Sequence, residues 1–498
     1  MSEPALTSRA RTVSLARMTE RFDVVIVGAG LSGVGAGCYL RRECPGKSFV
    51  LLEGREAIGG TWDLFRYPGI RSDSDMFTFG YSFEPWPGDR ALADGQQIRE
   101  YVQSTARKYG VDSRVRFGHR VTRSSWSSAA NEWTIEVTRG DGTTTTFTAG
   151  ILWMCTGYYR YDAGYTPEFA GREQFRGRVV HPQLWPEDLD YSGQRVVVIG
   201  SGATAVTLVP ALAGKAAHVT MLQRSPSYVL SRPGVDKVAR GLRRVLPEGL
   251  AYALSRWKNV ALGSLMYQLA RRRPAKMREF LLSQVQRALG PDHAVDPNFT
   301  PRYDPWDQRL CLVPDNDLFK AIRSGKADVV TDTIETFTEH GLRLGSGREL
   351  PADLVVTATG LELLFLGGSE LVVDGEAVDL ASRLSFKGFM LSDVPNLVFT
   401  VGYTNASWTL RADLVAQHVC RLLRHMDRAH ARRVVARPGP DPERRPLLDL
   451  TSGYVQRSLD RFPKQGAGGP WRVRQNYFSE YGMLRVGAVD DPALEFSA

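Results

Sequence analysis

The same local design occurs twice in this chain: a short apolar strand that runs straight into a glycine-rich turn. Residues 22–27 read FDVVIV and stop at Gly28, and residues 195–199 read RVVVI and stop at Gly200. A buried parallel strand followed by glycines and a helix start is typical of a nucleotide-binding unit. Two such units predict an α/β fold with two Rossmann-like dinucleotide-binding domains.

The first turn has the residues that a pyrophosphate site needs. Gly30 and Gly33 allow a tight turn and let the next helix start close to the phosphates, with its free N–H groups toward them. A second apolar run ends at Glu53, where a carboxylate accepts hydrogen bonds from a ribose diol. The residues expected around this first cofactor are Gly28, Gly30, Leu31, Ser32, Gly33, Glu53, Gly60, Thr61 and Trp62.

The second turn is followed by a different strand end. Its second strand stops at Arg224, with Ser225 beside it. An acid suits a free ribose 2′-hydroxyl, whereas Arg and Ser suit a 2′-phosphate. We therefore expect FAD at the first turn and NADP(H) at the second; the alternative for Arg224 is a solvated strand end. The residues expected around the second cofactor are Gly200, Ser201, Gly202, Ala203, Thr204, Arg224 and Ser225.

The stretch between the two units, residues 175–186, reads FRGRVVHPQLWP. Phe175, Gly177, His181 and Trp185 stand in it at the spacing F-x-G-x-x-x-H-x-x-x-W. We interpret the stretch as the joint between a flavin module and a nicotinamide module. A histidine can serve acid–base catalysis, but we expect His181 to hold backbone groups while the nicotinamide domain shifts.

A turn-rich loop, residues 59–73, follows the first unit and reads GGTWDLFRYPGIRSD. In pyridine-nucleotide disulfide reductases the residue after Gly-Gly-Thr typically begins a redox cysteine pair, but here it is Trp62, so thiol chemistry is not expected. Asp73 has two interpretations from these residues alone. It lies near the flavin, or it is a loop residue paired with Arg66 or Arg71.

Positive charge is concentrated in one segment. Thirteen Lys and Arg lie between residues 232 and 287 against three acidic residues, whereas the whole chain carries +9. This does not indicate a nucleic-acid-binding chain. Apolar residues recur there at helical spacing, on one face from Val235 to Val245 and on another from Leu250 to Leu265. We expect a helical insertion packed on the nicotinamide domain; the alternative is contact with a membrane surface.

Cysteine and histidine spacing predicts neither a disulfide framework nor a metal site. The longest apolar stretch is too short to span a bilayer, and the first twenty residues lack the apolar region of a secretory signal. A cytoplasmic protein is expected, with peripheral membrane association as the alternative.

The domain boundaries follow from these features. Residues 115–147 alternate like an antiparallel meander, and residues 151–156 form a strand that returns to the first sheet. We expect Asn405 to contact the cofactor, just before a helix over 409–425 whose N-terminus faces the flavin ring. We expect a flexible extension over 1–20 and an FAD domain made of two parts, 21–165 and 361–498, the second of which includes a C-terminal wrap. The linker and the NADP domain are expected over 166–230 and 299–360, with the helical insertion between them over 231–298.

Two motifs, over residues 59–73 and 175–186, resemble the fingerprints of class B flavoprotein monooxygenases of the Baeyer–Villiger type. Within that family the chain is most similar to the mycobacterial ethionamide-activating group, notably over FTPRYDPWDQRL (299–310) and VGYTNASWTL (401–410).

The resemblance implies an NADPH-dependent, FAD-containing monooxygenase. In that family the reduced flavin takes up dioxygen, and the flavin peroxide inserts one oxygen atom into a ketone, giving an ester or lactone, or oxygenates sulfur. Arg309 matches the family's active-site arginine, which stabilises the peroxide and the oxyanion adduct, and Asp73 matches the aspartate that pairs with it. Many members carry Lys before this arginine; here it is Gln308, which removes a cation near the nicotinamide nucleotide.

Three other functions are alternatives to an NADPH-dependent monooxygenase that acts on ketones. The nearest is a sulfur- or nitrogen-oxygenating flavin monooxygenase with little ketone activity, which Trp185 and Arg309 disfavour. An electron-passing reductase lacks its cysteine pair here. A dinucleotide-binding protein at a membrane surface would have no need of Asp73 together with Arg309.

Overall fold

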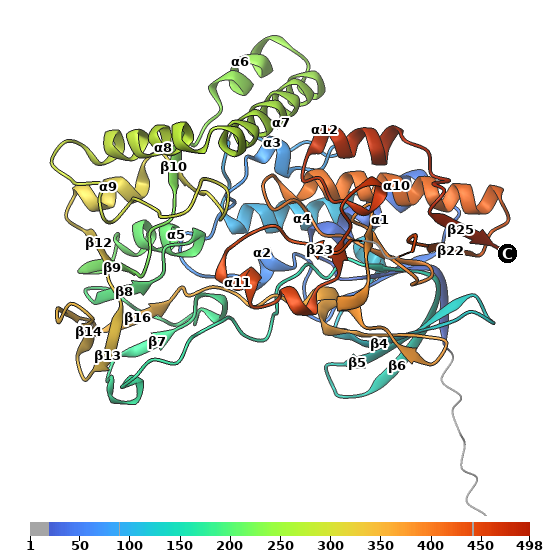
Figure 1. The fold of residues 1–498 in the computed structure, drawn as a ribbon, viewed down its shortest axis with the longest axis horizontal. Coiled ribbons are helices and arrows are strands. Elements are labelled where there is room, and N and C mark those ends of the chain that lie inside the picture. Colours follow the sequence, from blue (N-terminus) through green and yellow to red (C-terminus); the bar gives the residue numbers. More distant parts are fainter. Residues whose placement is uncertain (1–18, 89, 441–442) are drawn as a thin grey trace, which may run out of the picture.

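The computed structural model describes residues 19–88, 90–440 and 443–498, and two separate sheets organise it (Figure 1). The extension expected over 1–20 lies outside the described residues except for Thr19 and Glu20. The first strand begins at Glu20, earlier than the predicted Phe22, because Glu20 already pairs with Phe147.

The first sheet has nine strands, and its parallel part carries the first glycine turn. The order is β18-β17-β4-β5-β6-β1-β2-β3, with β21 also on β6. Its strands are β1 (Glu20–Val27), β2 (Phe49–Leu52), β3 (Val115–Arg116), β4 (His119–Ser127), β5 (Glu132–Arg139), β6 (Thr144–Met154), β17 (Glu370–Val373), β18 (Glu376–Ala377) and β21 (Leu397–Phe399).

Strand β6 corrects one prediction. The sequence suggested a meander that ends at 147 and a separate strand over 151–156, but β6 is a single strand of 11 residues. Its first half pairs antiparallel with β5, and its second half pairs parallel with β1. One long strand can therefore belong to both the meander and the nucleotide-binding part of the sheet.

The second sheet is entirely parallel and carries the second glycine turn. Its five strands run in the order β12-β9-β8-β16-β7. Their bounds are β7 (Arg178–Val180), β8 (Arg195–Ile199), β9 (His218–Gln223), β12 (Ala327–Thr331) and β16 (Leu354–Thr357), covered by α5 (Ala203–Leu212) and α9 (Asp317–Arg323). The predicted α/β fold with two nucleotide-binding units is confirmed.

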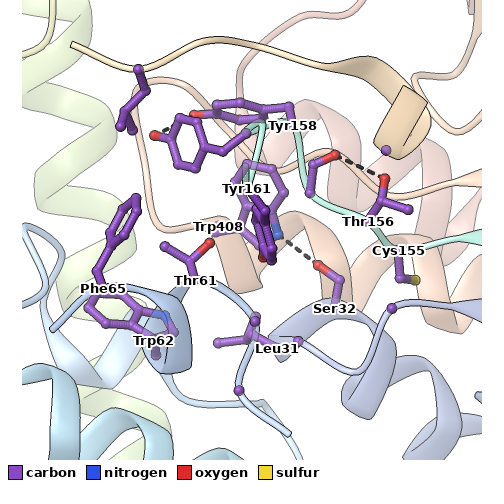
Figure 2. A pocket seen from close by; sticks show the side chains of 18 of the residues that line it. Leu31, Ser32, Thr61, Trp62, Phe65, Cys155, Thr156, Tyr158, Tyr161 and Trp408 are labelled. Carbon is purple, nitrogen blue, oxygen red and sulfur yellow. Dashed lines mark hydrogen bonds between the residues drawn. The ribbon is translucent and has the colours of Figure 1, made fainter. Parts of the chain in front are cut away.

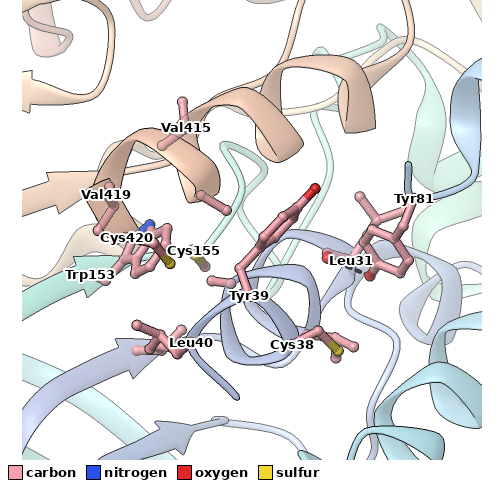
Figure 3. Close-up of a cluster of buried hydrophobic side chains, with 14 of the residues drawn as sticks. Leu31, Cys38, Tyr39, Leu40, Tyr81, Trp153, Cys155, Val415, Val419 and Cys420 are labelled. Carbon is pink, nitrogen blue, oxygen red and sulfur yellow. Dashed lines mark hydrogen bonds between the residues drawn. The ribbon is translucent and has the colours of Figure 1, made fainter. Parts of the chain in front are cut away.

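Helices α1 (Leu31–Glu43) and α10 (Trp408–Arg428) pack on each other and bury the centre of the first unit. Figure 3 shows Tyr39 and Leu40 of α1 facing Val415, Val419 and Cys420 of α10 across this core. The helix predicted over 409–425 is thus present and longer, and most of its residues are buried, the polar Arg411, Asp413 and His418 among them.

The basic insertion forms α6 (Lys237–Val245), α7 (Glu248–Arg272) and α8 (Pro274–Leu289). Only α8 packs as predicted, against β10 (Val229–Arg232) and α9 of the nicotinamide unit. Helix α7 instead packs on the flavin unit, where buried Arg256 pairs with Asp413 of α10 at 3.1 Å. The apolar faces predicted to pack are largely exposed, because α7 packs through its other side, where Tyr252, Arg256 and Val260 are buried.

Apart from α4, the remaining helices and strands are short. They are α2 (Thr61–Leu64), α3 (Met76–Phe79), α4 (Gly95–Lys108), α11 (Gly453–Gln456), α12 (Tyr477–Glu480), β11 (Cys311–Pro314), β13 (Ile334–Thr338), β14 (Gly341–Leu344), β15 (Glu349–Pro351), β19 (Ser385–Phe386), β20 (Met390–Leu391), β22 (Arg433–Ala436), β23 (Arg445–Pro446), β24 (Lys464–Gln465) and β25 (Leu494–Ser497). Among the residues that the structure describes, no helix combines the length and apolar character needed to cross a bilayer.

Candidate active site between the two nucleotide-binding units

A cavity of about 420 Å³ lies at the carboxyl ends of β1 and β2 and extends toward α5. Most of the residues predicted for the first cofactor line it, and Figure 2 shows Leu31, Ser32, Thr61 and Trp62 among them. The predicted catalytic pair lines it as well. The predicted residues on its wall are Gly28, Gly30, Leu31, Ser32, Glu53, Gly60, Thr61, Trp62, Asp73, Ala203, Thr204 and Arg309.

The glycine turn fits a pyrophosphate for steric reasons. A Cβ on Gly33 would stand 1.9 Å from the carbonyl oxygen of Gly28, so no other residue lets α1 start this close to β1. Gly33 therefore shapes the turn without lining the cavity itself. At the helix start, Gly30 gives no side-chain cap, which leaves the first N–H groups of α1 free for phosphate oxygens. These residues fit the FAD expected from the sequence.

Glu53 has a second task besides the one predicted for it. Its carboxylate accepts hydrogen bonds from the backbone N–H of Ala29 at 2.7 Å and of Arg55 at 2.9 Å. Burial raises the pKa of Glu53, although both hydrogen bonds oppose that shift. Glu53 thus braces the glycine turn, and it also lines the cavity where a ribose would lie.

The predicted pair of Arg309 and Asp73 is formed. The Nη1 of Arg309 donates to Oδ2 of Asp73 at 3.1 Å. The two side chains keep 31% and 33% of their surface exposed, and both line the cavity, so the cation still has N–H groups for a ligand. Burial alone would lower the pKa of Arg309, but Asp73 and three tyrosines raise it well above its ordinary value.

The simpler alternative for Asp73 is wrong. Arg66 donates to Asp63 at 2.7 Å, and Arg71 donates to Asp317 at 2.6 Å. Both arginines that stood near Asp73 in the sequence therefore have other partners, and its partner comes from a loop 236 positions away.

Several aromatic residues on the cavity wall were not predicted. The indole N–H of Trp408 donates to Ser32 at 2.7 Å, and Tyr158 packs on the Trp408 ring, as Figure 2 shows. Tyr161 approaches from the same loop, above Thr61. Trp408 lies inside the motif VGYTNASWTL, so the sequence contained a signal that could have predicted it. No sequence motif pointed to the tyrosines.

The second glycine turn is only partly on the cavity. Ala203 and Thr204 line it, whereas Gly200, Ser201 and Gly202 do not. A Cβ on Gly200, whose φ is +142°, would stand 2.3 Å from the carbonyl oxygen of Ala358. Gly200 is therefore required because the end of β16 passes so close to it. Gly33 is required in the same way, because Gly28 of the first turn lies so close to it.

The two residues predicted for a 2′-phosphate directly follow β9 at the surface. Arg224 and Ser225 are both exposed, and neither lines the cavity. The Ser201 hydroxyl donates to the carbonyl oxygen of Ser225 at 2.8 Å, which ties the glycine turn to this strand end. This arrangement leaves the guanidinium of Arg224 accessible beside the second glycine turn.

The stretch predicted as a joint is in part an edge strand. Residues 178–180 form β7 and pair with β16, and the Phe175 ring packs on Phe337. A Cβ on Gly177 would stand 2.4 Å from the carbonyl oxygen of Asp353. The first half of this stretch is therefore part of the second sheet and not a separate connection.

His181 holds two backbone groups, as expected. Its Nε2–H donates to the carbonyl oxygen of Gly360 at 3.1 Å, and its Nδ1 accepts from the N–H of Gln183 at 3.1 Å. Burial lowers the pKa of His181. Trp185, four positions on, packs edge-on against Tyr191. Neither residue lines the cavity, which places both of them away from the reacting atoms.

A second cavity of about 150 Å³ adjoins the first and shares Asp73 and Arg309 with it. Asn405, predicted to contact a cofactor, lines this second cavity and not the first. Its amide donates to the carbonyl oxygen of Gln475 at 2.8 Å. Helix α7 forms another wall through residues such as Met266. Asp73 and Arg309 therefore stand between a larger cavity and a smaller one.

Comparisons with known proteins agree with this geometry. The flavin-binding monooxygenase-like family matches residues 22–283. The chain is 56% identical to the FAD-containing monooxygenase EthA of Mycobacterium tuberculosis (strain ATCC 25618 / H37Rv), over 96% of this chain and 98% of that one.

Two solved structures share the fold. A steroid monooxygenase bound to NADP superposes with a TM-score of 0.74 at 21% identity, over 96% of this chain and 99% of that one. An open form of cyclohexanone monooxygenase gives 0.71 at 20% identity, over 96% and 100%. The sequence likeness confirms the predicted class of enzyme: the chain belongs to the flavin-binding monooxygenase-like family.

Proposed function

We propose that this enzyme is an FAD-containing, NADPH-dependent monooxygenase that inserts one oxygen atom of dioxygen into ketones and also oxygenates sulfur compounds. The observation that carries the proposal is the Arg309–Asp73 pair at the boundary between the two cavities. The relative EthA is named FAD-containing, and the steroid monooxygenase was solved with NADP, which supports both cofactors.

Bound FAD, reduced by NADPH, supplies the oxygen-activating chemistry. The glycine turn and the free N–H groups of α1 hold its pyrophosphate, and Glu53 faces its ribose. Arg224 and Ser225 bind the 2′-phosphate of NADPH, because a guanidinium with a neighbouring hydroxyl suits a phosphate better than a diol.

Arg309 acts on the ketone. Its free N–H groups bind the carbonyl oxygen, on which negative charge grows as a nucleophilic oxygen adds to the carbonyl carbon. A cation held in place stabilises that charge without moving during the reaction. Asp73 is a positioning residue: its carboxylate fixes the guanidinium and keeps it protonated.

Aromatic side chains keep water from the reacting atoms. Trp62, Phe65, Tyr158 and Trp408 stand around the first cavity in Figure 2. A dry wall strengthens the attraction between Arg309 and developing charge, since little solvent is present to screen it.

The test is oxygen transfer from ¹⁸O₂ to an aryl alkyl ketone and, separately, to an aryl alkyl sulfide, with NADPH consumption recorded. One labelled ester and one NADP⁺ per turnover support the proposal. A labelled sulfoxide without any ester supports the alternative of a sulfur-oxygenating enzyme. NADPH consumption that yields only hydrogen peroxide refutes an oxygenase.

A further inference from the structure

Helices α6 and α7 present an apolar stripe to solvent. On α7 the residues Leu250, Leu254, Trp257 and Leu265 recur at helical spacing on one side, and Leu265 is 54% exposed. Val245, the last residue of α6, is 77% exposed as well. Large apolar residues scattered singly are ordinary on a protein surface, but a continuous stripe indicates a contact site.

The opposite side of α7 is fixed to the flavin unit, so the stripe cannot turn inward. Arg256 donates to the carbonyl oxygens of Phe77 and Gly80 at 2.9 and 2.6 Å and pairs with Asp413. The Asn259 amide adds a hydrogen bond to Asp75. Figure 1 shows α6 and α7 projecting from the top of the molecule, with α12 beside them.

An aromatic cluster lies at the edge of the stripe. The ring of Trp257 stacks on Phe478 with centroids 6.1 Å apart, and Tyr481 meets it edge-on. Trp257 and Phe478 are 42% and 46% exposed. Half-exposed Trp and Tyr rings are typical of side chains that sit at the boundary between lipid and water.

The helices that carry the apolar stripe, and the start of α8 after them, also carry exposed cations. The segment carries thirteen Lys and Arg against three acidic residues, and Lys237, Arg244, Arg272 and Lys276 are exposed. We infer that the α6–α7 face docks on the surface of an anionic lipid bilayer, with the stripe in the outer acyl layer and the cations at the headgroups. The positive charge favours an anionic lipid surface over a neutral apolar partner.

Docking there has a consequence for substrate access. Gly263, Met266 and Tyr267 of the same helix line the second cavity, which contains Arg309. The helix that meets the bilayer is thus one wall of the space next to the catalytic pair. Apolar substrates dissolved in lipid would be concentrated on this side of the enzyme.

Co-sedimentation of the FAD-loaded enzyme with phosphatidylglycerol vesicles at low ionic strength tests the inference, with phosphatidylcholine vesicles in parallel. The enzyme should bind only the anionic vesicles. Arg244→Glu with Arg272→Glu should weaken binding by about fivefold or more for each cation removed. Leu254→Gln with Leu265→Gln should weaken it as well, while oxidation of a water-soluble ketone continues.

Two matched controls lie elsewhere on the surface. Arg178→Glu on β7, at the far edge of Figure 1, and Leu184→Gln, another exposed leucine, should bind vesicles like the wild type. Equal binding by the wild type and both α6–α7 variants would overturn the inference, as would absence of binding. A dimer in sedimentation velocity that Leu254→Gln with Leu265→Gln abolishes would also overturn it, by assigning the face to a second copy. None of these outcomes depends on oxygenase activity.

Discussion

The guanidinium of Arg309 lies 3.1 Å from the carboxylate of Asp73, although 236 positions separate them in the chain. Asp73 belongs to the loop after α2, and Arg309 precedes β11 next to the second sheet. The ion pair therefore spans the two nucleotide-binding units, and it exists only when those units are packed as they are here.

Arg309→Lys is expected to lower the rate of ketone oxygenation on the order of 100-fold. Lysine keeps the charge but loses the planar fork that can bind Asp73 and a carbonyl oxygen together. Bound FAD per protein should stay the same. Arg195→Lys, at an arginine paired with Asp353 on the surface, is the matched control and should keep full activity. Wild-type ester formation by Arg309→Lys would contradict the role.

Arg224→Ala is expected to raise KM for NADPH about tenfold or more and to leave KM for NADH unchanged. The 2′-phosphate, which NADH lacks, would lose a charge-assisted hydrogen bond. Steady-state kinetics with both nucleotides checks this, and Arg178→Ala serves as a control on an exposed cation of β7. An equal rise for both nucleotides would mean that Arg224 does not read the phosphate.

Gly33→Ala is expected to remove most of the bound FAD. The new Cβ would stand 1.9 Å from the carbonyl oxygen of Gly28, so the turn and the start of α1 must move apart. Gly202→Ala in the second turn is the matched control for FAD loading, because its Cβ meets nothing within 4 Å. The flavin absorbance per protein measures the effect, and full loading of Gly33→Ala would refute the steric argument.

His418→Asn is expected to reduce the loss of stability in acid. Burial lowers the pKa of His418 to about 4, and its Nδ1–H donates to the carbonyl oxygen of Leu484 at 2.8 Å. The unfolded chain binds this proton near pH 6.5 and the folded chain does not. The stabilising contribution is therefore complete above pH 6.5 and is lost as the pH falls toward 4, on the order of 3 kcal/mol in all.

Asparagine keeps the donor to Leu484 but does not titrate. Urea unfolding at pH 7.5 and pH 5 should therefore show a smaller decrease in free energy for His418→Asn than for the wild type. His340→Asn, at a histidine whose side chain is 75% exposed, should decrease like the wild type. Identical pH dependence in all three proteins would exclude His418 as the source.

Local chemistry was enough to predict the two nucleotide-binding units. Gly28 and Gly200 adopt φ of +104° and +142°, which other residues rarely adopt. The positions of the two turns can therefore be predicted from the glycines in the sequence. The strands before them are apolar because parallel strands are buried on both faces. Most residues of the first cofactor site follow, since they are neighbours in the sequence of one turn.

Packing between distant segments decided the rest. The Asp73–Arg309 pair was expected only from family resemblance, and Trp408 reaches Ser32 across 376 positions. The apolar faces of α6 and α7 look like core positions in the sequence, yet buried Arg256 and its partner Asp413 turn them outward. A periodic pattern tells which side of a helix is apolar. Which side faces the protein depends on the surfaces it meets, and those exist only in the folded chain.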